Sequence, residues 1–77
     1  MQGYTIKFLH IVQSLAKRYP DRPVFKLAEK AISSGVSIVD IADHMNVSRQ
    51  SVYKWFRGET AMRDQDVEKL EQYLKNF

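Results

Sequence analysis

Five side chains with hydrogen-bonding groups lie close together near the middle of the chain: Arg49, Gln50, Tyr53, Lys54 and Arg57. An arginine can donate two hydrogen bonds to guanine O6 and N7, and a glutamine amide is matched to adenine N6 and N7. Lys54 and Arg57 suit phosphate oxygens by their length and charge. No acidic residue stands between Asp43 and Glu59, so no negative side chain within this stretch offsets its positive charge. These residue types and their spacing favour a surface that binds nucleic acid.

A short helix must present these side chains. Val52, Trp55 and Phe56 recur at three- and four-residue steps, which gives the helix one apolar side and leaves the five polar residues on the other. Ser48 is a favourable N-cap residue, and Gly58 is a favourable residue at which to end the helix. We therefore expect a helix between Ser48 and Gly58, with Arg49 and Gln50 in its first turn.

A second short helix precedes it. Ser37 and Asp40 have the spacing of a capping box, and the apolar residues Ile38, Ile41, Ala42 and Met45 fall on one face. Asn46 follows, and asparagine tolerates the left-handed conformation that a tight turn requires. Val47 can pack underneath the turn. The stretch 37–58 therefore predicts two helices joined by a tight turn.

Several positions of this stretch agree with one known family. They are Ala42 where the helices cross, Asn46 and Val47 in the turn, Val52, and Trp55 ahead of Arg57-Gly58-Glu59. In these positions the chain resembles the helix-turn-helix repressors of the phage Cro and lambda-repressor type, strongly over roughly the middle third and more loosely from Pro23 to the end. Two positions depart from the pattern: Asn46 replaces the usual glycine, and Phe56 stands where the family mostly has a polar residue.

The resemblance implies a role for each polar residue of the motif. Arg49, Gln50 and Tyr53 are expected to contact bases in the major groove of double-stranded DNA. The serines of the motif are expected to contact the DNA backbone, together with the two cations already assigned to phosphate by length and charge. The expected phosphate contacts are thus Ser37, Ser48, Ser51, Lys54 and Arg57.

The remaining periodic segments predict an all-α fold of five helices in a single domain over residues 1–77. An additional helix is expected over about 5–19, a further helix from near Pro23 to Gly35, and a C-terminal helix over about 64–76. Only about five residues separate the motif from the last helix, too few for a wing hairpin. The family has four or five helices around its motif, so the helix over about 5–19 is an addition.

Composition narrows the class of protein. The 77 residues are 44% apolar and carry a net charge of +3, which indicates a small folded domain with a polyanionic partner. There is no cysteine, and His10 and His44 are the only histidines, so we expect no metal, no cofactor and no catalytic centre. Because neither a membrane-spanning run nor a signal-peptide pattern is found, we expect a cytoplasmic location, which for this family means the bacterial cytoplasm and its nucleoid.

The C-terminal helix carries more apolar residues than a single stripe on a small core requires. We expect some of them, with Phe56, to form a two-fold interface between copies of the chain; the candidates are Phe56, Leu70, Tyr73, Leu74 and Phe77. Alternatively, the same residues pack into the core of one chain.

Together these patterns predict a sequence-specific regulator of transcription, most simply a homodimeric repressor of phage or prophage type that reads a pseudo-palindromic operator. One alternative is a protein-binding adaptor such as an antitoxin or an anti-regulator, which would need apolar residues on the exposed face of the second motif helix. A recombination-directing DNA binder is a second alternative that the sequence does not separate from a repressor.

Overall fold

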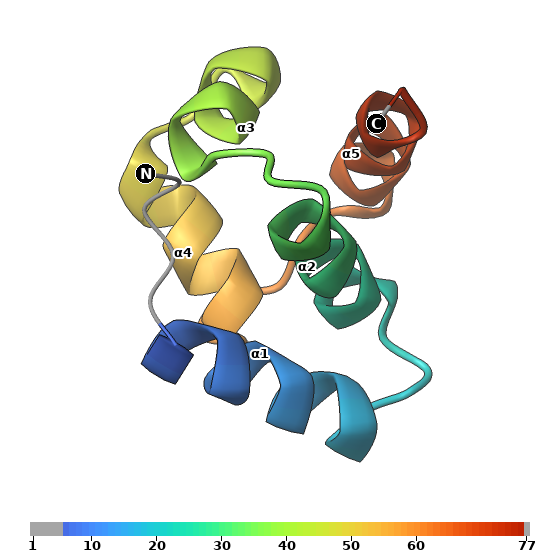
Figure 1. Ribbon diagram of the computed structural model, residues 1–77. Coiled ribbons are helices and arrows are strands. Elements are labelled where there is room, and N and C mark those ends of the chain that lie inside the picture. Colours follow the sequence, from blue (N-terminus) through green and yellow to red (C-terminus); the bar gives the residue numbers. More distant parts are fainter. Residues whose placement is uncertain (1–5, 77) are drawn as a thin grey trace.

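The computed structural model describes residues 6–76, which form five α-helices and no strand (Figure 1). The helices are α1 (Ile6–Arg18), α2 (Pro23–Ser33), α3 (Ile38–Met45), α4 (Arg49–Arg57) and α5 (Asp64–Leu74). The expected all-α, five-helix class is therefore confirmed. The C-terminal helix ends at Leu74, two residues before the expected boundary. Thr5, at which the first helix was expected to begin, lies outside the described residues.

The helices surround one apolar core. Helix α2 packs against α1, α4 and α5, and α4 packs against α1, α2 and α3. Helix α3 also packs against α5. Helices α2 and α4 therefore each contact three other helices. The largest side chains with almost no solvent exposure come from every helix: Val12, Phe25, Ile38, Ile41, Val52, Phe56, Leu70 and Leu74. Burial of these apolar surfaces is the main favourable term in the stability of the fold.

The two central helices, α3 and α4, begin and end as their capping residues predict. The Ser37 hydroxyl accepts a hydrogen bond from the Asp40 amide at 3.1 Å, and Asn46 ends α3 in the left-handed conformation with φ 58°. Gly58 ends α4 at φ 79°, where a Cβ atom would lie only 3.2 Å from Cζ of Phe25. Glycine is thus needed at position 58 for its conformation and for the close approach of α2.

Three residues expected at a two-fold interface lie instead in the core of the single chain. Phe56, Leu70 and Leu74 are each 0% exposed, so they have no surface left for a second copy to contact. Phe56 turns inward with Val52 and Trp55, which explains how α4 accommodates a large ring at a position that is usually polar. The outer face of α5 is polar, with exposed Gln65, Glu68, Lys69, Glu71 and Gln72.

The apolar stripe of α1 is only partly covered. Phe8, Val12 and Ala16 are buried, but Ile11 is 37% exposed and Tyr19, directly after the helix, is 39% exposed. A helix that packs on two neighbours buries a limited arc, and these residues lie at its edge and end. No helix among residues 6–76 is both long and apolar enough to span a bilayer.

The buried position of Phe56 can be tested by its effect on stability. We expect Phe56→Ala to lower the free energy of unfolding by about 3 to 5 kcal/mol, because the substitution leaves a cavity in the core. Urea denaturation at several protein concentrations measures this loss. Ile11→Ala, at an exposed position, should change stability much less. A loss that depends on protein concentration would instead place Phe56 at an interface between copies.

Candidate nucleic-acid interface

The first turn of α4 presents two of the three expected base-reading residues to solvent. Arg49 and Gln50 are both exposed, directly after the N-cap Ser48, while the opposite side of α4 is buried through Val52 and its neighbours. Lys54 is exposed one turn further along the same helix. The free side of α4 is therefore polar and basic along its length, as its sequence pattern predicts.

The serines of the motif have structural partners of their own. The Ser48 hydroxyl accepts a hydrogen bond from the Ser51 amide at 3.2 Å, and the two hydroxyl oxygens lie 3.0 Å apart. Ser37 plays the same capping part for α3. Side chains that cap helix starts are held in fixed positions, and a serine that accepts from an amide keeps its hydroxyl hydrogen for donation. Ser37 can therefore cap α3 and also donate to a phosphate, and Ser48 can do the same for α4 when Ser51 is the donor between the two hydroxyl groups.

Tyr53 is half-buried, because a residue from outside the motif packs against it. The ring of Phe8, in the first turns of α1, meets the Tyr53 ring edge to face, with centroids 5.4 Å apart and planes at 84°. Edge-to-face pairs of this kind contribute about 0.5 to 1.5 kcal/mol beyond the area they bury. The apolar period of residues 5–19 indicated a packed helix, but it carried no signal for which helix Phe8 would contact.

Arg57 is engaged within the chain on two sides. Its Nε atom lies 2.8 Å from Oε2 of Glu59, and its guanidinium carbon lies 6.0 Å from the centre of the Tyr53 ring. The Arg57 and Glu59 side chains are 40% and 53% exposed, so solvent screens the ion pair and its contribution to stability is small. Part of the positive charge expected at the phosphates is nevertheless offset by Glu59. In the sequence, the only indication of this ion pair was that Glu59 follows Arg57 by two residues.

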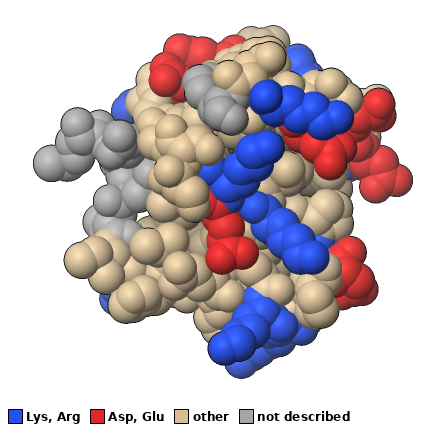
Figure 2. Space-filling view, turned by 45° about the vertical axis from the view of Figure 1, so that its right-hand side comes forward, with Lys and Arg blue, Asp and Glu red and all other residues tan. Residues whose placement is uncertain are grey.

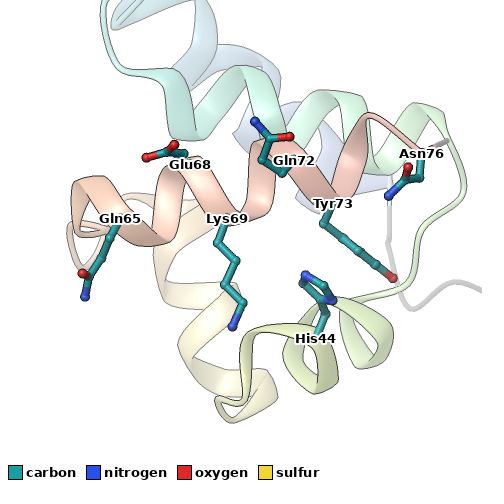
Figure 3. A pocket seen from close by; sticks show the side chains of 7 residues that line it. All are labelled: His44, Gln65, Glu68, Lys69, Gln72, Tyr73 and Asn76. Carbon is teal, nitrogen blue, oxygen red and sulfur yellow. The ribbon is translucent and has the colours of Figure 1, made fainter.

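A polar hollow lies between α3 and α5 (Figure 3). Its lining includes His44, whose ring stacks on that of Tyr73 with centroids 4.1 Å apart and planes at 19°. Burial raises the pKa of Tyr73, and the negative charge of Asp40 raises that pKa further. The half-buried ring of Tyr73 therefore packs on a residue of its own chain, His44. Phe77, the last residue assigned to an interface, lies outside the described residues.

Helices α3 and α4 are both capped and are joined by a short turn that contains Asn46 in the left-handed conformation, and the polar side of α4 faces solvent. This arrangement is that of a DNA-binding protein of the helix-turn-helix class. A family model described as helix-turn-helix matches residues 27–76, which cover α3, α4, α5 and most of α2. The chain belongs to this family, of the Cro and lambda-repressor type, and is a DNA-binding regulator of transcription. No curated protein and no solved structure matches the chain. Helix α1 lies before the matched residues.

The pairing of Arg57 with Glu59 leads to a test on DNA affinity. We expect Glu59→Gln to tighten binding to duplex DNA of any sequence by about 1.4- to fivefold, because it frees Arg57 from a screened ion pair worth about 0.2 to 1 kcal/mol. Fluorescence anisotropy with a labelled duplex measures the dissociation constant. Glu71→Gln, an exposed residue on α5 with the same change in charge, is the matched control. An equal gain in both variants would mean that net charge alone is responsible.

Proposed function

We propose that this regulator is a repressor that places α4 in the major groove of its operator and reads bases through Arg49, Gln50 and Tyr53. The observation that carries the proposal is the exposure of Arg49 and Gln50 on the first turn of a helix anchored by its opposite face. A helix with its side chains is about 10 to 12 Å across, and the major groove is about 12 Å wide, so α4 fits the groove.

Phosphate contacts would hold α4 in register on the duplex. Lys54 and Arg57 offer cationic groups, and Ser37, Ser48 and Ser51 offer hydroxyl groups close to the starts of α3 and α4. Contacts of this kind position a protein on DNA and make its affinity depend on salt, but they carry no sequence information directly. The two sets of residues should therefore differ in the effects of their substitution.

The composition of the exposed side of α4 supports DNA over a protein partner. The exposed large apolar residues among residues 6–76 are Ile6, Ile11, Tyr19 and Val39, and none of them is on α4. A protein-binding adaptor that used this helix would need apolar anchors there, because buried aromatic and aliphatic side chains supply most of the energy of protein interfaces. The exposed residues of α4 are instead hydrogen-bond donors suited to bases and phosphates.

Repression by covering a promoter of phage or prophage type is the simplest activity for a DNA-binding regulator of this kind. Two copies would bind a pseudo-palindrome with recognition helices about 34 Å apart. Because the outer face of α5 is polar and its two leucines, Leu70 and Leu74, are buried, we infer that the two copies associate on the operator and are monomeric away from it.

The division between base and phosphate contacts predicts different effects for two neighbouring cations. Arg49→Ala should cost about 1 to 3 kcal/mol on the preferred duplex and relax the preference at one base pair. Lys54→Ala should weaken binding to all duplexes and lower the slope of log K against log salt by roughly one unit. Selection from a random duplex pool, followed by salt titrations, measures both effects. Equal losses on every sequence would overturn the assignment of roles.

The proposed assembly predicts a change of mass on the operator. Light scattering at micromolar concentration should give a mass near 9.0 kDa for the free protein. Addition of the selected pseudo-palindromic duplex should give a complex with two chains, whereas a duplex that carries one half-site should bind one chain. A complex with one chain on the full operator would refute the two-fold arrangement.

A further inference from the structure

Positive and negative charges are distributed unevenly among the helices. Helices α1 and α4 contain six of the twelve basic residues and none of the nine acidic ones. The rest of the chain therefore carries six basic and nine acidic residues, for a net charge of −3. The overall charge of +3 thus combines a charge of +6 on two helices with an acidic remainder. Only one of these two helices belongs to the helix-turn-helix motif.

These two basic helices are neighbours in space. Helix α1 packs on α4, and the contact between Phe8 and Tyr53 fixes the N-terminal end of α1 beside the middle of α4. The other end of α1 leads to α2 (Figure 1), and there the Tyr19 ring lies 6.1 Å from the ring of Phe25. The N-terminal end of α1 is therefore close to Tyr53, in the middle of α4, whereas its C-terminal half lies beside α2 and Gly58, the residue that ends α4.

Lys7 is at the end of α1 near α4. It directly precedes Phe8, whose ring is buried against Tyr53, while the Lys7 side chain is exposed. Lys17 is also exposed but stands about 15 Å further along the helix, at the end beside α2, given a rise of about 1.5 Å per residue. The same helix thus offers one lysine beside the middle of the recognition helix and one about 15 Å further along α1.

The side of the molecule formed by α2 and α5 carries charges of both signs. Figure 2 brings forward the side on which α2 and α5 lie, and there the Lys and Arg side chains lie close to Asp and Glu side chains. A mixed surface of this kind gives a weaker field at a polyanion than a surface without acids. The acid-free pair of helices is therefore the better match to the charge of a DNA backbone.

We propose that α1 extends the DNA-binding surface beyond the helix-turn-helix motif, with Lys7 contacting a backbone phosphate beside the base pairs that α4 reads. This contact rests on the proposed placement of α4 in the major groove. It assigns a binding role to the helix that lies outside the residues matched by the family. In this arrangement the contact between Phe8 and Tyr53 positions Lys7 for DNA binding, because it holds the N-terminal end of α1 beside α4.

The experiment compares Lys7→Ala with Lys17→Ala, which remove the same charge from exposed positions of the same helix. For Lys7→Ala we expect the slope of log K against log salt to fall in magnitude by about 0.9, and the dissociation constant at 0.1 M salt to rise about eightfold, as for the loss of one phosphate contact. The base preference should stay unchanged. For Lys17→Ala we expect the slope and the affinity of the parent protein.

Each other outcome overturns the contact. An unchanged slope in Lys7→Ala would mean that α1 does not touch the duplex, and equal shifts in both variants would mean that only net charge matters. Lys54→Ala separates this failure from failure of the proposed function. If Lys54→Ala flattens the slope while Lys7→Ala does not, only the contact by α1 is wrong. If the parent protein prefers no duplex over another, the proposed function is wrong and the Lys7 contact is overturned with it.

Discussion

The burial of one side of α4 is the interaction on which the rest of the structure depends. Val52, Trp55 and Phe56 fix the helix to the core, and an α-helix that buries residues at three- and four-residue steps must turn the others outward. Arg49 and Gln50 are therefore exposed on a rigid element instead of a mobile loop. Rigid presentation lowers the entropic cost of binding, because the helix that carries the polar side chains is already ordered before DNA binds.

Local backbone chemistry sets the geometry of the two central helices. Asn46 and Gly58 adopt left-handed conformations that end α3 and α4, and Ser37 and Ser48 satisfy amides at their starts. The turn between the helices is short because each end is closed by its own residues. Asparagine supplies the turn conformation without glycine, so the departure of this chain from the usual family residue leaves the arrangement of α3 and α4 intact.

Electrostatics separates the molecule into two regions. The two acid-free helices, α1 and α4, lie together, and the acidic residues are spread over the other segments. A positive region backed by an acidic one orients the molecule as it approaches a polyanion, which speeds productive encounters. Glu59 moderates this field at one point, through its ion pair with Arg57.

The sequence by itself determined the helices, their caps and the exposed face of α4, because these depend on periods of three or four residues and on the conformational preferences of single residues such as Asn46 and Gly58. Only the tertiary structure decided what each apolar face packs against. An apolar stripe shows that Phe56, Leu70 and Leu74 avoid water, but the same stripe suits a core or an interface between chains. The structure places these three in the core and sets Phe8 beside Tyr53, because shape and volume, which a linear pattern does not record, select the partner of each side chain.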